Sequence, residues 1–447
     1  MSTGMVYSLA TAAVQVMAVV LALWYCIVWL VCSIGYYQLR TKFTRSYLSK
    51  SSRRGLSAPG VSILRPLKGI DPEFEACISS AFEQDYPKFE VLLCVDSPTD
   101  PAIPVVRKIM AQYHHIPSQL FIGAENFGVN PKVNNLIRAY DVAQHDILWI
   151  LDSNCWVAPG ALGRAIDTFE ADKSIQLVHH LPLVVDISGH WGSRLDEMFL
   201  STAHAKFYVA INTVAVAPCV MGKSNLFRRS QLNKVVPLGI KAFAKFIAED
   251  QQIGDGIWQA GGRHAMNCDA VIQPVGDTGL ADYFFRRMRW LRVRKYIVLA
   301  ATLVEPMTEC FLCGAMGATA ASILAGAQWT VFFSVHVLLW ALGDFWIYTN
   351  LHRHGNVDPP GTALPGTRKS SPTPYFALPK QKISGSNDSA RWIVSWLARE
   401  AMALPIWINA MAGTQIQWRN RLFYIKPDAT AVEIQQPGKI NQQKTIT

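Results

Sequence analysis

An acidic pair and a basic element stand in order along the chain, and an apolar stretch follows them. The pair is Glu249-Asp250, and the basic element is Arg286-Arg287-Met288-Arg289-Trp290. A carboxylate can take the proton from an attacking alcohol, and guanidinium groups can neutralise a departing diphosphate. The apolar stretch would let an acceptor arrive from a lipid phase. The competing interpretation is that the arginines only anchor a membrane helix.

Two further aspartates directly follow predicted strands. Asp96 comes after the apolar run Val91–Val95, and Asp152 comes after Asp146–Leu151. Ligands of parallel α/β sheets gather at the carboxyl ends of the strands. A divalent cation such as Mg²⁺ or Mn²⁺ that bridges two phosphates prefers carboxylate oxygens, although an aspartate in such a place is also a common helix cap. Together with Glu249-Asp250 the pattern favours Asp152 as a metal ligand and Asp250 as a general base.

These side chains need a scaffold, and the pattern around them indicates an α/β domain. A buried strand is predicted at 60–64 and a helix at 71–84. A second helix is predicted at 132–143, with Asn130 as its N-cap and Pro131 in its first turn. Strands that alternate with helices predict a mostly parallel sheet. The amphipathic stretch 191–211 carries His204, and its apolar face is either core or the wall of an acceptor site.

The composition predicts a membrane protein. Half of the residues are hydrophobic and only 17% are charged. The stretch Met5–Tyr37 is long enough to cross a bilayer, and basic residues follow it, so we expect an uncleaved anchor with the following chain in the cytosol. Further apolar segments lie at about 297–325, 329–349 and 392–412. Glu305, Pro306 and Glu309 interrupt the first of them, so its early half is expected along the interface.

The chain is therefore expected to divide into seven parts. They are an N-terminal anchor at 1–37, a basic cytosolic linker at 38–59, a catalytic domain at 60–296, membrane or interfacial helices at 297–350, a proline-rich linker at 351–390, a membrane or re-entrant helix at 391–412 and a tail at 413–447.

The net charge of +10 does not indicate nucleic acid as a partner. The basic residues gather beside apolar segments, where topology and anionic headgroups account for them, and no zinc-finger spacing or aromatic RNA-binding signature is present. Membrane lipids are the better partner. The nine cysteines are scattered, and Cys310 with Cys313 is interpreted as a pair of buried thiols, which fits a reduced, cytosol-facing domain.

An ordered set of motifs resembles the ceramide glucosyltransferase family, also called glucosylceramide synthases. The motifs are Val61-Ser-Ile-Leu-Arg-Pro-Leu-Lys-Gly69, Tyr86-Pro-Lys-Phe-Glu-Val-Leu-Leu-Cys-Val95, Asn130-Pro-Lys-Val-Asn-Asn-Leu136, Ile247-Ala-Glu-Asp250 and Arg286-Arg-Met-Arg-Trp290. The resemblance implies an A-type glycosyltransferase fold, with transmembrane or interfacial helices at both ends. It also implies inverting transfer of glucose from UDP-glucose to ceramide, with Mg²⁺ or Mn²⁺, by a multi-pass protein of the Golgi membrane whose catalytic domain faces the cytosol.

The resemblance also implies roles for single residues. Asp250 is the expected base, Asp152 the metal ligand, and Arg286, Arg289 and Trp290 the diphosphate-binding signature. Glu249 and Trp290 are also predicted to line the acceptor pocket. The expected donor-binding residues are Asp96 or Asp100, Lys132, Asp152, His204, Arg286 and Arg289. The first aspartate motif reads Val-Asp-Ser-Pro-Thr-Asp-Pro here, which leaves open whether Asp96 or Asp100 lies near the uridine.

Two rivals stay open at this point. One is a related glycosyltransferase, either a polyprenyl-phosphate sugar transferase or a processive polysaccharide synthase, although a channel-forming synthase would need more apolar segments than this chain has. The other is a non-catalytic lipid-binding or transport protein, in which the acidic residues are caps and core pairs.

Overall fold

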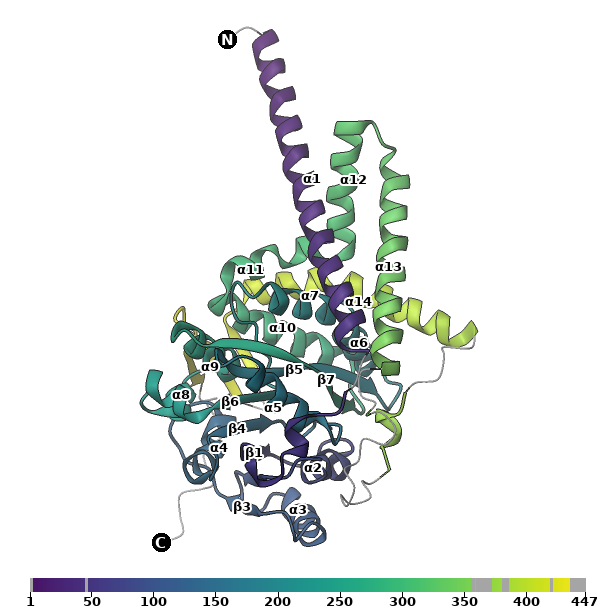
Figure 1. Ribbon diagram of the computed structural model, residues 1–447. Helices are drawn as coiled ribbons and strands as arrows, with labels where there is room; N and C mark the ends of the chain where they lie inside the picture. Colours follow the sequence, from purple (N-terminus) through teal and green to yellow (C-terminus); the bar gives the residue numbers. More distant parts are fainter. Residues whose placement is uncertain are drawn as a thin grey trace.

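The computed structural model describes residues 3–44, 47–354, 358, 372–379, 386–418 and 421–434. An α/β body carries three long helices that project from it on one side, with the N-terminus at the far end of the first (Figure 1). The projecting helices are α1 (Thr3–Lys42), α12 (Cys310–Ala325) and α13 (Trp329–His354). Short 3-10 helices lie at Ser51–Arg53, Gly55–Ser57, Gly239–Phe243, Glu305–Thr308 and Tyr375–Ala377.

The body is built on a sheet of seven strands in the order β3-β2-β1-β4-β6-β5-β7. Their bounds are β1 Val61–Leu67, β2 Phe89–Val95, β3 Ser118–Ile122, β4 Ile147–Leu151, β5 Ile175–Asp186, β6 Ser224–Arg228 and β7 Arg263–Val275. All neighbours pair in parallel except β6, which is antiparallel to β4 and β5. The prediction of a mostly parallel α/β sheet is therefore confirmed.

Helices cover both faces of this sheet, which explains why β1, β2 and β4 are buried along their whole length. One face packs against α2 (Phe74–Phe82), α3 (Ala102–Gln112) and α5 (Ala161–Ala171). The other packs against α4 (Pro131–Val142), α8 (Arg229–Val235) and α9 (Glu249–Gln259). Fully buried strands are apolar on both sides, so they could be recognised in the sequence as continuous hydrophobic runs.

Strand β1 is longer than predicted, because it continues through Arg65 and Pro66 to Leu67. A charged side chain can lie in this buried strand because both terminal nitrogens of its guanidinium group are hydrogen-bonded. The guanidinium group of Arg65 donates to the backbone oxygens of Cys77, Ser153 and Cys155. Arg65 thereby ties β1 to α2 and to the turn that follows β4.

The predicted amphipathic stretch 191–211 forms two helices instead of one. They are α6 (Trp191–Ser201) and α7 (Ala203–Val214). The helical conformation is interrupted at Thr202, whose φ is −128° and ψ is −92°. Helix α6 packs against β5 and α10 (Leu280–Ile297), whereas α7 packs against α1. The break lets one amphipathic sequence contact both the sheet and the membrane helices.

Two helices are long and apolar enough to cross a membrane, α1 and α13. A bent pair adds a third candidate span, because Leu299–Thr308 and Cys310–Ala325 meet at 72°. The bend falls where Glu305, Pro306 and Glu309 interrupt the apolar run, and α11 (Leu299–Val304) precedes it. Within the described residues, the chain thus has two candidate spans, or three if the bent pair is one. The prediction of membrane helices is confirmed.

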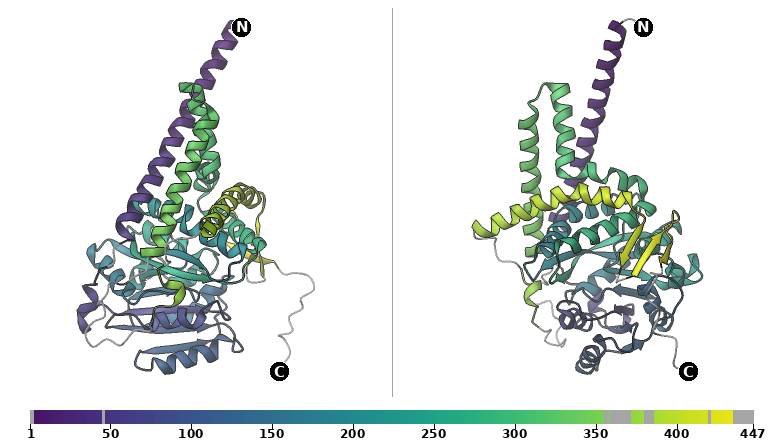
Figure 2. Two further views of the ribbon diagram at one scale, coloured as in Figure 1. Left: turned by 90° about the vertical axis from the view of Figure 1, so that its right-hand side faces the viewer. Right: turned by 180° about the vertical axis from the view of Figure 1, so that it is seen from behind.

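Helix α14 (Ser386–Ala412) crosses near the bases of α12 and α13 at a steep angle to them (Figures 1 and 2). Its Trp392 and Trp396 pack against Trp340 of α13 and Cys310 of α12. Near its middle, Arg399 lies 2.7 Å from Glu309 and also pairs with its neighbour Glu400. Such buried ion pairs explain why this segment carries charges in an apolar sequence.

Helix α1 contacts α7 through backbone atoms. A Cβ atom at Gly35 would lie 2.3 Å from the backbone oxygen of Lys206, so only glycine fits there. The Lys206 ammonium, on α7, lies 2.7 Å from Asp344 of α13, which also accepts a 2.9 Å hydrogen bond from Trp396 of α14. We call Lys206, Asp344, Glu309, Arg399 and Glu400 the membrane-side network.

The C-terminal segment forms a second sheet that the sequence did not predict. Its antiparallel strands are β8 (Gln415–Trp418), β9 (Arg421–Ile425) and β10 (Ala431–Ile434). Phe423 and Ile425 pack against Val293 of α10 and Ile247. The backbone N–H of Ala431 donates to Lys245, so the sheet is attached to the segment that leads into α9.

Candidate active site

Several of the predicted site residues lie at the edge of the sheet where the parallel strands end. The side-chain amide of Asn135 donates to the oxygens of Leu67 and Cys94, which joins the ends of β1 and β2. Helix α4 begins at the same edge, where the Asn130 side chain accepts from the backbone N–H groups of Lys132 and Val133. The predicted N-cap is confirmed, and it fixes the direction in which Lys132 leaves the helix.

Lys132 brings two of the predicted carboxylates together. Its Nζ lies 2.8 Å from Asp152 Oδ1 and 2.9 Å from Glu249 Oε1. A second lysine, Lys223, lies 3.4 Å from Asp152 Oδ2. With Asp250, which follows Glu249 at the start of α9, these residues form what we call the catalytic cluster: Lys132, Asp152, Lys223, Glu249 and Asp250.

The ion pairs keep Lys132 and Asp152 charged. Burial alone would lower the pKa of Lys132, but Asp152 and Glu249 outweigh burial and raise it. Burial would likewise raise the pKa of Asp152, but Lys132 and Lys223 lower it below its usual value. Near neutral pH Lys132 and Asp152 are therefore both charged and form an ion pair beside the end of β4.

Asp250 differs from the other carboxylates of the cluster. Within the described part of the chain it forms no ion pair. Burial, with the negative charge of Glu249, raises the pKa of Asp250 to about 7. A Cβ atom at position 222 would lie 2.8 Å from Asp250 Oδ2, so Gly222 makes the room that this carboxylate occupies. A half-buried carboxylate with a pKa near the working pH has the properties of a general base.

Glu249 is buried, and both of its carboxylate oxygens contact residues at the start of α4. One of its oxygens accepts from Lys132, and the other accepts a 2.8 Å hydrogen bond from the Asn130 side chain. Both contacts tie the start of α9 to the start of α4. Its predicted place in the acceptor pocket stays a prediction, since its described contacts are with α4.

The two candidates for the uridine contact have different surroundings. Asp100 accepts hydrogen bonds from the backbone N–H groups of Gly69 and Ala102, so it holds the turn after β1 against the start of α3. Asp96 is exposed at the end of β2, where its charge acts on Arg421 of β9. The carboxylate of Asp96 is the more accessible of the two, and its role stays a prediction.

Helix α10 carries the predicted diphosphate-binding residues. Arg286 lies 2.5 Å from Asp196 of α6. Burial raises the pKa of Asp196 to about 6, although Arg286 opposes the shift. Arg289 and Trp290 are half-buried one turn further along the helix. The structure therefore orients Arg286 through a carboxylate that the sequence did not single out.

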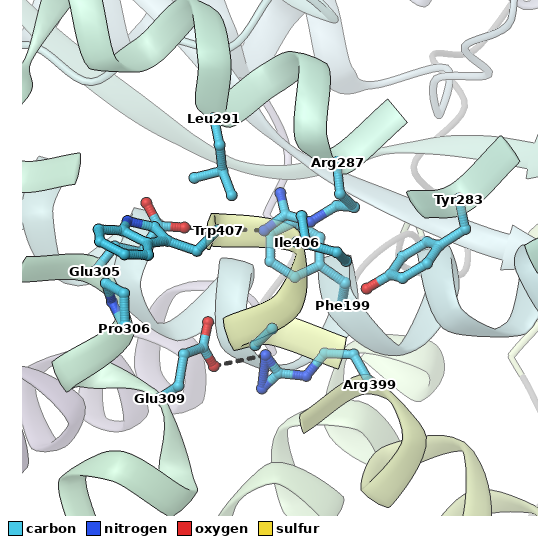
Figure 3. Close-up of a pocket in the computed structure, with 11 residues that line it drawn as sticks. Phe199, Tyr283, Arg287, Leu291, Glu305, Pro306, Glu309, Arg399, Ile406 and Trp407 are labelled. Carbon is cyan, nitrogen blue, oxygen red and sulfur yellow. Dashed lines mark hydrogen bonds and ion pairs between the residues drawn. The ribbon is translucent and has the colours of Figure 1, made fainter. Parts of the chain in front are cut away.

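The neighbouring Arg287 is buried between an aromatic ring and a carboxylate (Figure 3). Its guanidinium carbon lies 3.3 Å from the centre of the Phe199 ring, and it lies 3.9 Å from Glu305. Beside it Arg399 pairs with Glu309. The cavity among these side chains measures about 10 Å³, which is room for about one water molecule. Arg287 thus joins α6 and α10 to the membrane-side network.

His204 lies one layer away from the catalytic cluster. Its ring stacks on Tyr208, with 4.8 Å between centroids. Burial, with the charge of Arg287, lowers the pKa of His204 to about 3, so the ring is neutral at physiological pH. The Tyr208 hydroxyl accepts from the backbone N–H of Met221, next to Gly222. Among the described residues, His204 is linked to the segment beside Gly222 through Tyr208, and its predicted donor-binding role stays a prediction.

Lys223 and Asp196 are site residues that sequence reasoning missed. Lys223 follows Gly222, and this glycine was the only local sign that the segment approaches another group closely. Asp196 lies in an amphipathic helix where a charged residue is ordinarily solvated.

The residues present do not fit a divalent cation held by the protein alone. Both oxygens of Asp152 lie beside lysines, whose charge opposes a cation. Among the described residues, no group of three or more His, Cys, Asp and Glu side chains could hold a metal ion. The metal role predicted for Asp152 stays a prediction, and the chemistry below uses the chain's own residues.

Comparison with known proteins places most of the chain in one family. The model of glycosyl transferase family 21 matches residues 25–431. A ceramide glucosyltransferase of Komagataella phaffii is 41% identical, over 94% of this chain and 92% of the relative. A ceramide glucosyltransferase of Candida albicans is 33% identical, over 92% and 97%. One of Pyricularia oryzae is 35% identical, over 93% and 95%.

Among solved structures, the chain is similar to the mannosyltransferase PcManGT from Pyrobaculum calidifontis in complex with GDP-Man and Mn²⁺. The two are 18% identical with a TM-score of 0.44, over 74% of this chain and 99% of that chain.

Proposed function

Because this chain belongs to glycosyl transferase family 21, we propose that it transfers glucose from UDP-glucose to the primary hydroxyl of ceramide, giving β-glucosylceramide and UDP. The observation that carries the proposal is the similarity, over nearly the whole chain, to three relatives named ceramide glucosyltransferase. The catalytic cluster supports it, since it holds two lysines and, within the described residues, one carboxylate that forms no ion pair.

Asp250 is the base in this reaction. The hydroxyl oxygen of ceramide attacks the anomeric carbon while its proton passes to the Asp250 carboxylate, and the bond from that carbon to the UDP oxygen breaks. Attack from the face opposite UDP inverts the configuration in a single displacement, so no covalent sugar intermediate forms. The raised pKa of Asp250 makes it a stronger proton acceptor than an exposed aspartate.

Positive charge near the cluster stabilises the leaving diphosphate. Lys132 and Lys223 lie beside Asp152, and Arg286 and Arg289 are on α10, where Arg286 pairs with Asp196. A charge that is already held in place costs little reorganisation when the diphosphate leaves. A divalent cation on Asp152 is an addition to this proposal that a chelation experiment can test.

The membrane helices supply the acceptor side. Two described helices are able to cross a bilayer, and ceramide is a membrane lipid. We propose that the protein lies in the Golgi membrane. Basic residues in the last turns of α1 and α13 support a cytosolic catalytic domain. A processive synthase is a weaker alternative, since the described chain offers only two or three candidate spans to line a channel.

The deciding experiment offers the purified full-length protein ceramide and an equimolar mixture of UDP-sugars. Mass spectrometry of the lipid product should show a single hexosylceramide, and NMR should show a β-glucosyl linkage. A different sugar, an α linkage, or transfer only to a polyprenyl phosphate in a parallel reaction would overturn the proposal.

A further inference from the structure

A second cavity lies at the foot of α1, away from the catalytic cluster. It measures about 490 Å³, which is within the usual range of small-ligand sites. The last turns of α1, the end of α7 and the start of β7 line it, and the side chain of Trp258 on α9 closes one side. None of its lining residues belongs to the catalytic cluster.

The polar lining of this cavity is basic. Its polar side chains are Gln38, Lys42, Asn212, Thr213, Arg263 and His264. Within the described part of the chain, no acidic residue lines it. The charge of Arg263 acts on one carboxylate outside the lining, that of the exposed residue Asp172. A cavity lined in this way favours an anion.

His264 is poised to donate to such an anion. Only 9% of this residue is exposed, and neither ring nitrogen has a hydrogen-bond partner among the described residues. Burial lowers the pKa of His264, so the ring is neutral and keeps one N–H donor. A buried polar group without a partner costs free energy, and an anion in the cavity would remove that cost.

The place of the cavity points to a lipid as the source of the anion. Gln38 and Lys42 lie in the last turns of the candidate membrane span α1, so the cavity lies where this helix meets the α/β body. The loop beside them exposes Val214 and Val216, which are 53% and 81% accessible, so an apolar edge borders the basic lining. Acyl chains can follow this edge while a headgroup occupies the cavity.

We propose that the cavity at the foot of α1 binds the phosphate group of an anionic membrane lipid, with Lys42, Arg263 and His264 as donors. Ceramide carries no charge, so two cations in this cavity would serve a different lipid from the acceptor. The proposal does not depend on the transfer reaction, because its lining and the catalytic cluster share no residue.

The test measures lipid retention by native mass spectrometry of the full-length protein in detergent. The probe is dioleoyl phosphatidic acid, and the comparison lipid is dioleoyl phosphatidylcholine. We expect one phosphatidic acid bound per chain. The double variant Lys42→Gln with Arg263→Gln should bind it about tenfold or more weakly, since each basic residue near a membrane contributes about 1 kcal/mol to the binding of an anionic lipid.

The matched control is Arg40→Gln with Arg353→Gln, which removes two positive charges from the ends of α1 and α13 without changing the cavity lining. It should bind phosphatidic acid within about twofold of the unmodified protein. Equal weakening in both double variants would show a diffuse charge effect and overturn the site. Inorganic phosphate that displaces the lipid at equal concentration would overturn the lipid as its ligand.

His264→Phe gives a second readout if the double variant fails to fold. Phenylalanine keeps a ring to pack against Trp258 and removes both nitrogens. We expect weaker phosphatidic acid binding with an unchanged or higher melting temperature, because the variant also removes unpartnered polar atoms. Unchanged lipid binding in this variant would exclude His264 as a donor and overturn the assignment.

Discussion

The catalytic cluster and the membrane-side network use the same residue types for opposite purposes. In the network, Lys206 and Asp344 are both fully buried and lie 2.7 Å apart, so these two charges are matched to each other. In the catalytic cluster Lys132 is shared between Asp152 and Glu249, while Asp250 has no ion pair within the described residues. Matching one buried lysine to one buried carboxylate joins α7 to α13, whereas leaving one carboxylate of the catalytic cluster without an ion pair yields a group able to accept a proton.

Loss of the unmatched carboxylate should have the largest effect. Asp250→Asn should lower kcat by about a thousandfold, because general-base catalysis contributes about 10² to 10⁴. UDP-glucose affinity should stay within a few-fold, since the base acts mainly in the transition state. Steady-state kinetics and calorimetry measure the two effects.

The matched control is Asp255→Asn, which changes a carboxylate one turn further along α9. It should keep kcat within a few-fold. If the Asp250 variant turns over at a rate near that of the unmodified enzyme, Asp250 is not the base.

Breaking the matched pair should instead reduce stability. Lys206→Met leaves Asp344 charged and buried, which costs about 3 to 5 kcal/mol. We expect a large drop in melting temperature in detergent, with normal kcat in the fraction that stays folded. Adding Asp344→Asn should recover part of the loss, because the uncompensated charge is gone.

An exposed pair provides the contrast for this measurement. Lys108 lies 3.0 Å from Glu75, and their side chains are 69% and 54% exposed. Lys108→Met should therefore hardly change the melting temperature. Equal effects at Lys206 and Lys108 would show that burial does not distinguish the two regions.

A smaller loss is expected at the arginines of α10. Arg289→Lys keeps the charge but removes the planar group that can grip two oxygens at once. We expect kcat/KM to fall by about tenfold to a hundredfold, measured with UDP-glucose as the varied substrate. Arg107→Lys on α3 is the control and should leave kcat/KM unchanged. Near-normal activity of Arg289→Lys would show that Arg289 does not bind the diphosphate and serves only as a membrane anchor.

The smallest expected effect is a shift of the pH profile. Asp250 must be deprotonated to act as a base, so kcat/KM should rise as the pH passes about 7. Glu249→Gln removes a neighbouring negative charge that raises this pKa, and the rise should then move to lower pH. The pH–rate profiles of both proteins provide the measurement. A profile that stays in place would show that Glu249 does not influence Asp250.

The same shift has a consequence for stability. The pKa of Asp250 is higher in the folded protein than its usual value of 3.8. The folded state therefore binds this proton more tightly, and this group's contribution to the free energy of unfolding decreases as the pH rises from about 4 to about 7. Asp250→Asn should flatten that part of the stability curve.

Local patterns were enough to predict much of the catalytic domain. Strands β1, β2 and β4 are buried on both faces, so their hydrophobic runs were visible, and Asn130-Pro131 fixed the start of α4. Asp152, Lys132 and Glu249 were selected from their motifs, and the structure brings them together.

Features that depend on distant partners could not be predicted. The pairing of Lys223 with Asp152 and of Arg286 with Asp196 joins segments far apart in the chain, and no local pattern encodes it. The sheet β8–β10 consists of strands of four or five residues, too short for a clear alternation. The charges of Arg399 and Glu400 made sense only once Glu309 was placed beside them.

The close contact at Gly35 has a consequence for how the bilayer acts on the protein. The candidate span Leu9–Lys42 has 34 residues, about 50 Å at 1.5 Å per residue, whereas the hydrocarbon core measures about 30 Å. Helix α1 adapts to a thinner or thicker bilayer by tilting. Gly35 has no side chain between its backbone and that of α7, the helix that carries His204 and Tyr208. A change in the tilt of α1 would therefore move the backbone of α7 at Lys206, without a side chain between the two helices to absorb it.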